Sequence, residues 1–320
     1  MEGANLRLLY VVTDLIMPLI VGYFLHQKNI VSENSITKLI RFNVICVYTI
    51  LSLLSFWVLP LSLSLLLVPL FGFALVLLPG AIGFALFARR LPNLLDRGAY
   101  IASAMLANIG TLGGVCAFIL YNEAGFAYTQ IIGTCQNFLL CLVIFPLAQY
   151  YYVKYNNGVR KTSRWQSFRE MFISWNQLSL IGMIAGLYLN AADISRPDFL
   201  ATLFQSLVHI AAWIAMLPVG FLINFQQVRH YAHKVHSLTL LRFIITPAIF
   251  IVLTKIFVAD DILRHTLIIV AFCPTAINAV LASKLYKLSV DLAVSSFVIT
   301  TALFLVVWYI RYQKKKKARQ

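Results

Sequence analysis

Ten apolar stretches, each long enough to cross a bilayer as a helix, make up most of this 320-residue chain. About twenty apolar residues span the hydrocarbon core of a membrane. The stretches lie near residues 6–25, 37–59, 64–88, 99–121, 127–151, 174–191, 199–224, 237–258, 264–285 and 289–311. The composition agrees, since 61% of the residues are hydrophobic, 12% are charged and the mean hydropathy is +0.83. The sequence therefore predicts an all-α membrane protein with ten transmembrane helices.

The net charge of +15 raises the question of a nucleic-acid partner, but the basic residues are distributed as in a membrane protein. Sixteen lie after the odd-numbered stretches: Lys28, Lys38, Arg41, Arg89, Arg90, Arg97, Lys154, Arg160, Lys161, Arg164, Arg169, Arg229, Lys234, Arg242, Lys284 and Lys287. Four lie on the other side, apart from the C-terminal tail. The positive-inside rule places the sixteen in the cytoplasm and both termini outside, although the lysine run 314–317 opposes this orientation. We expect the lipid bilayer, and no nucleic acid, as partner.

The sequence carries no motif for catalysis, metal binding or ATP hydrolysis. None of the five cysteines forms a Cys-x-x-Cys pair, so neither a disulfide framework nor a zinc site is indicated. His230, His233 and His236 recur at spacing three, but Arg229 and Lys234 lie among them, so we interpret this segment as a basic interfacial loop. Gly-x-Ser-x-Gly, His-Glu-x-x-His and P-loop motifs do not occur. The sequence predicts neither an enzyme nor a bound cofactor or metal.

Polar breaks interrupt the fourth and the ninth apolar stretch. Residues 107–114 read Ala-Asn-Ile-Gly-Thr-Leu-Gly-Gly, and residues 273–278 read Cys-Pro-Thr-Ala-Ile-Asn. At bilayer depth, irregular backbone survives only where it is buried in protein or lines a cavity. A pair of broken spans in corresponding places of two halves is typical of a transporter binding site.

The longest polar stretch separates five apolar stretches from five others. It divides the chain into a first repeat at 1–153, a basic cytoplasmic linker at 154–173, a second repeat at 174–311 and a basic tail at 312–320. An odd number of spans in each half turns the second half upside down in the membrane. We therefore predict a 5+5 inverted repeat in which spans four and nine are broken and cross.

The residues of the two breaks resemble a known family of membrane carriers. Asn108-x-Gly110-x-x-Gly113 is similar to the fourth-span signature of the auxin efflux carrier family, and Pro274-Thr-Ala-x-Asn278 is similar to its ninth span. This chain has Val115 where the family usually has proline. The resemblance implies a secondary transporter of small organic anions, in particular carboxylates, that works by alternating access.

The resemblance also implies an organisation and a location. Spans three to five and eight to ten would form a moving transport bundle, and spans one, two, six and seven a scaffold through which a homodimer is possible. The long hydrophilic central loop of plant auxin exporters does not occur here, which favours a bacterial permease of the inner (plasma) membrane.

We predict that the substrate binds where the two breaks cross. A carboxylate that enters the bilayer loses water, and the N-termini of half-helices can replace those hydrogen bonds. Amide side chains add donors without a fixed charge at the midplane. The candidate substrate-binding residues are Asn108, Gly110, Gly113, Gly114, Pro274, Thr275 and Asn278. The alternative is that these are small residues that only pack helices together.

Two titratable residues lie within apolar stretches and are candidates for proton coupling. Asp14 lies in the first and His209 in the seventh. The alternative is a water-facing aspartate near the outer interface and a histidine that only bonds a neighbouring helix. Further polar residues within spans either line the cavity or bond neighbouring helices: Asn43, Gln130, Gln136 and Asn137.

Three other functions stay open at this point. A sodium-coupled organic-anion symporter of the same fold would need carboxylates near the crossover, and spans four and nine contain none apart from Glu123 at one end. An intramembrane enzyme would need a nucleophile or a metal pair. A passive channel would differ from a carrier because its flux does not saturate.

Overall fold

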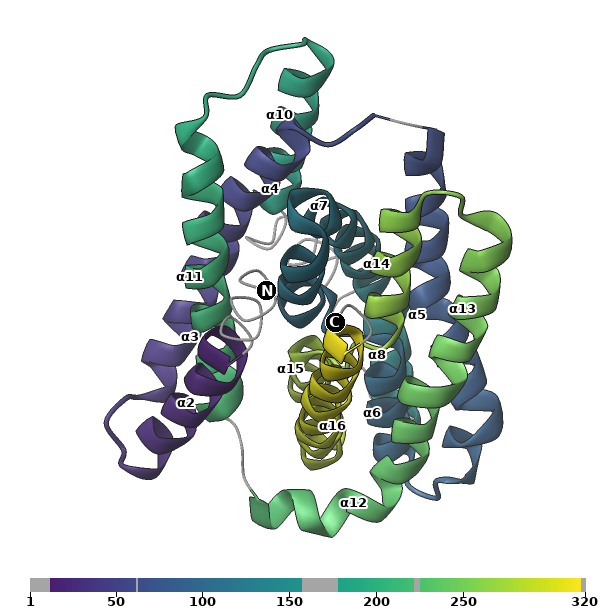
Figure 1. Cartoon of the computed structure of the whole chain (residues 1–320). Helices are drawn as coiled ribbons and strands as arrows, with labels where there is room; N and C mark the ends of the chain where they lie inside the picture. Colours follow the sequence, from purple (N-terminus) through teal and green to yellow (C-terminus); the bar gives the residue numbers. More distant parts are fainter. Residues whose placement is uncertain (1–11, 62, 157–177, 222–224, 318–320) are drawn as a thin grey trace. The chain divides into compact units, whose positions relative to one another are not determined.

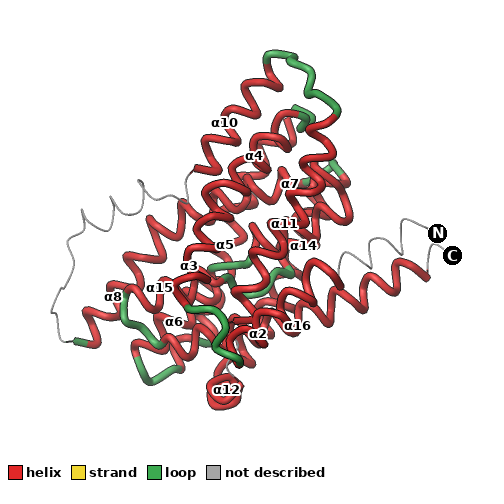
Figure 2. Tube along the Cα trace, turned by 90° about the vertical axis from the view of Figure 1, so that its left-hand side faces the viewer, coloured by secondary structure: helices red, strands yellow, loops and turns green. Residues whose placement is uncertain are grey.

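The computed structural model describes residues 12–61, 63–156, 178–221 and 225–317 (Figure 1). These residues form helices joined by short loops and contain no strand, only one isolated antiparallel bridge between Ala107 and Thr275 (Figure 2). The start of the first predicted span, most of the predicted linker 154–173 and the end of the tail lie outside the described residues.

Five helical stretches are long and apolar enough to cross a membrane, by length and composition. They are Glu33–Trp57, Leu67–Arg90, Ile109–Tyr155, Phe199–Pro218 and Tyr231–Phe257. The third of them joins parts of two predicted spans, because it runs through a kink at Tyr121 and Asn122. Spans four and nine are divided into shorter helices by their breaks, so they cannot reach this length as single helices. The prediction of an all-α membrane protein is confirmed, whereas the number ten and the inverted repeat stay predictions.

The chain forms two compact units, each described by itself. The first unit comprises residues 1–65, 110–134 and 162–223, and the second comprises residues 66–109, 135–161 and 224–320. Each unit therefore draws helices from both predicted repeats.

The α-helices of the first unit are α2 (Met17–Gln27), α3 (Glu33–Phe42), α4 (Tyr48–Trp57), most of α7 (Gly114–Leu139), α10 (Leu178–Ala191) and α11 (Phe199–Phe221). Those of the second unit are α5 (Leu67–Leu86), α6 (Leu94–Met105), α8 (Phe145–Tyr155), α12 (Phe225–Leu240), α13 (Thr246–Phe257), α14 (Asp261–Ala271), α15 (Ile277–Leu285) and α16 (Val290–Lys317). Short π-helical segments are η1 (Val12–Ile16), η2 (Asn43–Val47), η5 (Ile109–Gly113), η6 (Leu140–Ile144) and η8 (Leu241–Ile245).

Glycines bring two helix pairs of the first unit into backbone contact. A Cβ atom at Gly22 of α2 would lie 2.0 Å from the carbonyl oxygen of Leu217 in α11. In the other pair, a Cβ atom at Gly186 of α10 would lie 2.4 Å from the carbonyl oxygen of Leu53 in α4. Small residues of this kind are what lets helices approach closely in a membrane, where lipid removes the hydrophobic drive for association.

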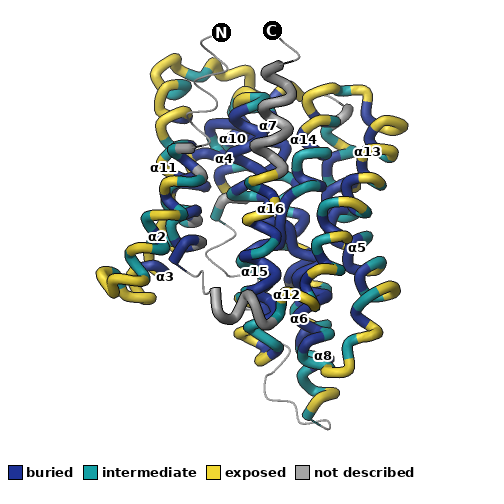
Figure 3. Tube along the Cα trace, turned by 60° about the horizontal axis from the view of Figure 1, so that its bottom comes forward, coloured by how far each residue is buried: buried dark blue, intermediate teal, exposed yellow. Residues whose placement is uncertain are grey.

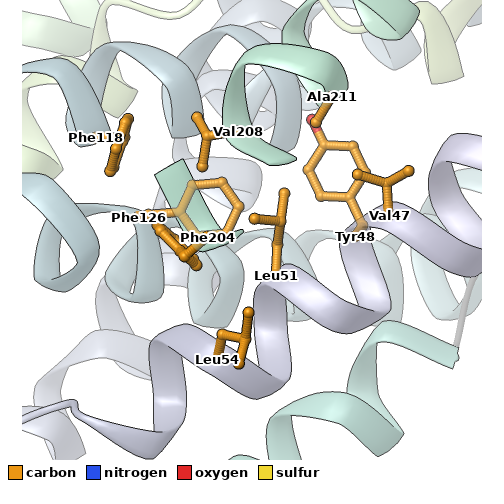
Figure 4. Packing of buried hydrophobic residues seen from close by; sticks show 9 residues of the cluster. All are labelled: Val47, Tyr48, Leu51, Leu54, Phe118, Phe126, Phe204, Val208 and Ala211. Carbon is orange, nitrogen blue, oxygen red and sulfur yellow. The ribbon is translucent and has the colours of Figure 1, made fainter. Parts of the chain in front are cut away.

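An aromatic cluster forms the core of the first unit. Phe204 packs edge-on against Phe118 and Phe126, with ring centroids 5.6 and 5.5 Å apart. Figure 4 shows these rings and the side chains of Tyr48 and Leu51 gathered between η2, α4, α7 and α11. The Tyr48 hydroxyl donates a hydrogen bond to the carbonyl oxygen of Gly110, at 3.2 Å. The core thus holds the start of the η5 segment.

In the second unit, the two half-helices that precede the breaks begin in the same way. The Asn93 side chain accepts a hydrogen bond from the N–H of Leu95 at the start of α6, at 2.9 Å. The Asp260 side chain accepts one from the N–H of Leu263 at the start of α14, at 2.8 Å. These N-caps start each helix at a defined residue. The later part of α6 is buried, as the dark blue segments of Figure 3 show.

Candidate functional site

The two predicted breaks meet each other in the second unit. The chain is extended at Leu106, where it leaves α6, and at Ala276, where it enters α15, and the two segments pair in antiparallel orientation. The N–H of Asn108 donates to the carbonyl oxygen of Pro274 at 2.8 Å, and the N–H of Ala276 donates to that of Leu106 at 2.9 Å. Each break thus satisfies backbone groups that the other has freed, as buried backbone requires. We call this paired segment the crossover.

Side chains from two further helices hold the crossover. The Gln136 side chain in α7 accepts a hydrogen bond from the N–H of Ala107 and donates one to its carbonyl oxygen, both at 2.8 Å. The Thr300 hydroxyl in α16 accepts a hydrogen bond from the N–H of Thr275 at 3.0 Å. The sequence is compatible with two roles for Gln136, to line the cavity or to bond a neighbouring segment. In the structure, Gln136 has the second role.

A buried arginine also reaches the crossover. The carbonyl oxygen of Ser103 accepts hydrogen bonds from the Thr275 hydroxyl and from Nη2 of Arg242, both at 3.1 Å. The assignment of Arg242 to a cytoplasmic loop is wrong, because the residue is 1% exposed and lies near the middle of the candidate span Tyr231–Phe257. The sequence contains one indication of this burial, because Arg242 lies inside the apolar stretch 237–258.

The structure gathers four of the predicted site residues in the second unit. Asn108, Pro274 and Thr275 are buried in the crossover. Asn278 is half-buried in the first turn of α15. The N-cap residue of α15, Ala276, makes no side-chain cap, and the positive end of that helix dipole lies beside the crossover.

The predicted glycines belong to the first unit. A Cβ atom at Gly110 would have no described atom within 4 Å, whereas one at Gly114 would lie 3.3 Å from the Phe126 ring. Gly113 is buried at the end of η5. Gly110 therefore has open space on its side-chain face. Gly114 is tightly surrounded, as expected of a small residue that packs helices together.

Asp14 and His209, the two titratable residues within apolar stretches, contact each other in the structure. Nδ1 of His209 in α11 lies 2.5 Å from Oδ2 of Asp14 in η1. Asp14 is 4% exposed, so the alternative of a water-facing aspartate is wrong. The Phe118 ring meets the His209 ring edge-on. This contact joins η1 to α11 within the first unit.

On the predicted transport function, we expect Asp14→Asn and His209→Gln to change the pH dependence of transport more than substrate affinity, because each variant removes one member of this buried pair. Initial uptake rates into proteoliposomes at a series of pH values measure this. His236→Gln, which removes an exposed histidine from α12, is the control and should keep the wild-type profile. Wild-type profiles in both test variants would leave the pair with a structural role only.

Two further ion pairs join residues far apart in the chain. Arg196 makes two hydrogen bonds to the Glu123 carboxylate, at 2.5 and 2.9 Å, within the first unit. Lys234 donates to Asp96 at 2.7 Å within the second unit. Glu123, the one acid that the sequence offered for sodium coupling, is thus held by a cation.

The segment with the three histidines is a helix and not the predicted loop. His233 and His236 are exposed on α12, which runs from Phe225 to Leu240, while the side chains of Arg229 and His230 lie outside the described ones. In the described part of the chain, no group of three or more His, Cys, Asp or Glu residues could hold a metal ion.

Comparisons with known proteins add no assignment. No protein-family model matches the chain, and a comparison with curated proteins finds no match either. The resemblance to the auxin efflux carrier family therefore stays a prediction, carried by the residues of the two breaks.

Proposed function

We propose that this protein is a secondary transporter of small organic anions, above all carboxylates, which binds its substrate at the crossover and works by alternating access. The observation that carries the proposal is the mutual pairing of the two breaks, in which Asn108 bonds to Pro274 and Ala276 to Leu106. A role in helix packing alone does not require the helices to be broken. Two interrupted helices that meet in mid-span are the arrangement that membrane carriers use for ligand binding.

The chemistry around the crossover suits an anion. The uncapped N-terminus of α15 presents backbone N–H groups and a partial positive charge. Asn278 lies in that first turn with an amide that can donate, and Asn108 is buried at the facing break. Such neutral donors replace lost hydration without a permanent charge of their own.

Corresponding contacts support the proposed 5+5 inverted repeat. The first break is held by Gln136 in predicted span five and the second by Thr300 in predicted span ten, each in the span that follows the broken one. The close pair of α2 and α11 joins predicted spans one and seven, and the close pair of α4 and α10 joins spans two and six. Exchange of the two halves converts one pair into the other, which is the relation that an inverted repeat requires.

The two units support the proposed division of labour. The helices of predicted spans one, two, six and seven fall in the first unit, and those of spans three, eight, nine and ten fall in the second. We propose that the first unit is the scaffold, through which copies could dimerise, and that the second is the transport bundle. Residues 110–134 depart from this division, because they belong to the first unit. The proposed location is the inner membrane of a bacterium.

The test begins with a thermal-shift screen of mono- and dicarboxylates on the purified protein, followed by uptake of the best ligand into proteoliposomes. Asn108→Leu and Asn278→Leu should each weaken binding on the order of ten- to a hundred-fold, because a lost hydrogen bond to a charged group is worth roughly 1.5–3 kcal/mol. Asn34→Leu, on an exposed position of α3, should bind as wild type.

Each outcome separates one alternative from the proposal. Wild-type affinity in well-folded variants at positions 108 and 278 would mean that the breaks serve packing alone. Uptake that does not saturate with substrate concentration would favour a channel. Uptake that depends on a sodium gradient would favour the symporter. The proposal is wrong if no carboxylate binds to or is transported by the wild-type protein.

A further inference from the structure

Arg242 is a buried cation without a buried counter-charge. It is 1% exposed on the η8 segment, near the middle of the candidate span Tyr231–Phe257. None of the ion pairs in the described part of the chain includes it. The nearby Cys273 thiol donates a hydrogen bond to the carbonyl oxygen of Ile269, so it acts as a donor. An unpaired charge at this depth is costly and is by default a sign of function.

The local structure explains only part of this arginine. In a continuous helix the carbonyl oxygen of Ser103 would accept from the N–H of Ala107, but that N–H donates to Gln136 instead. Arg242 and Thr275 donate to Ser103 in its place. A neutral donor would meet this need as well as a guanidinium does, as Thr275 itself shows.

Several donors that are bonded to Arg242 or lie near it in the sequence have no acceptor in the part of the chain that the structure describes. Among the described residues, neither the buried Nε of Arg242 nor the hydroxyl of Ser103 has a hydrogen-bond partner. The arginine is bonded to Ser103 through the backbone carbonyl group of that residue. The hydroxyl of Thr246, about one helical turn beyond Arg242, is also buried and has no partner among the residues that the structure describes. Buried polar groups in native proteins are nearly always satisfied. A full positive charge and several unpartnered donors together favour an acceptor that carries negative charge.

We propose that Arg242 binds the anionic group of the ligand at the crossover, with the hydroxyls of Ser103 and Thr246 as additional donors. This inference rests on the proposed function and adds a residue to its site: the ligand's carboxylate is neutralised by a fixed guanidinium as well as hydrogen-bonded by amides. A guanidinium presents several N–H groups in a plane, which matches the two oxygens of a carboxylate. Because Arg242 is buried here, the anion reaches it from a state in which the crossover opens, as alternating access requires.

The experiment measures thermal stabilisation of the purified full-length protein by sodium acetate, sodium succinate and sodium chloride, at constant ionic strength. In the wild type we expect saturable stabilisation by the carboxylates. Arg242→Gln should abolish it, and Arg242→Lys should raise the anion concentration at half-effect on the order of tenfold, because lysine keeps the charge but not the planar donor set. Lys255→Gln removes an exposed positive charge from the same candidate span and should respond as wild type.

The outcomes distinguish this inference from the proposed function. Wild-type stabilisation by carboxylates in Arg242→Gln overturns the inference and leaves the transporter proposal standing. If Arg242→Gln does not fold, a wild-type half-effect concentration in Arg242→Lys overturns it equally. Stabilisation by chloride alone, lost in Arg242→Gln, supports an anion site at Arg242 and contradicts the carboxylate substrate. A wild-type protein that no anion stabilises overturns the inference, and carboxylate uptake then decides the proposed function separately.

Discussion

Gln136→Leu is expected to lower the free energy of unfolding by about 2–6 kcal/mol, because it strands two buried backbone groups at about 1–3 kcal/mol each. The Gln136 side chain satisfies both the N–H and the carbonyl oxygen of Ala107, each at 2.8 Å, and Gln136 and Ala107 are buried. Leucine has a similar volume, so the loss falls on the hydrogen bonds and not on packing. Unfolding in detergent micelles, followed by tryptophan fluorescence, measures the change.

The same substitution six residues earlier in α7 provides the control. Nε2 of Gln130 is buried without a hydrogen-bond partner, so Gln130→Leu removes a donor that nothing in the described part of the chain accepts. We expect it to leave stability unchanged or to raise it, because replacing an unsatisfied buried polar group by an apolar one removes a desolvation cost. Equal losses in the two variants would show that the bonds to Ala107 do not stabilise the fold.

Gly22→Ala is expected to destabilise the first unit by about 3 kcal/mol or more, at the upper end of the usual cost of overpacking. The added Cβ atom would lie 2.0 Å from the carbonyl oxygen of Leu217, and backbone cannot move aside as a flexible side chain can. Gly220→Ala meets the mirror-image clash, 2.0 Å from the carbonyl oxygen of Leu19. Separation of α2 and α11 relieves both clashes, so the double variant should lose less than the sum of the single losses.

Gly133→Ala is the matched control for the glycine series. A Cβ atom at Gly133 would have no described atom within 4 Å, and alanine favours a helix by about 1 kcal/mol over glycine. We expect this variant to be as stable as the wild type or more stable. A loss comparable to that of Gly22→Ala, measured by the same unfolding assay, would contradict the close helix contact as the cause.

The class of the protein and the places of its breaks could be predicted from the sequence. The hydropathy of a membrane span depends only on its own twenty or so residues. The apolar stretches could therefore be found without knowing which helices lie next to them in space. The breaks at Asn108 and at Pro274 could be found for a related reason. Glycine, proline and asparagine act on the backbone at their own positions and favour an interrupted helix. In the middle of a membrane span, such an interruption occurs only where it is buried in protein or lines a cavity.

The partners of these residues were decided by the tertiary structure alone. Asp14 and His209 are 195 residues apart, and Arg242 is 139 residues from the carbonyl group to which it donates. No periodicity or spacing relates such positions, because they meet only through the path of the helices between them. The sequence thus determined an all-α membrane protein with two interrupted helices. Tertiary structure decided that the interruptions pair, which amide holds them and which buried charge lies beside them, since hydrogen bonds depend on distances in space and not on separation along the chain.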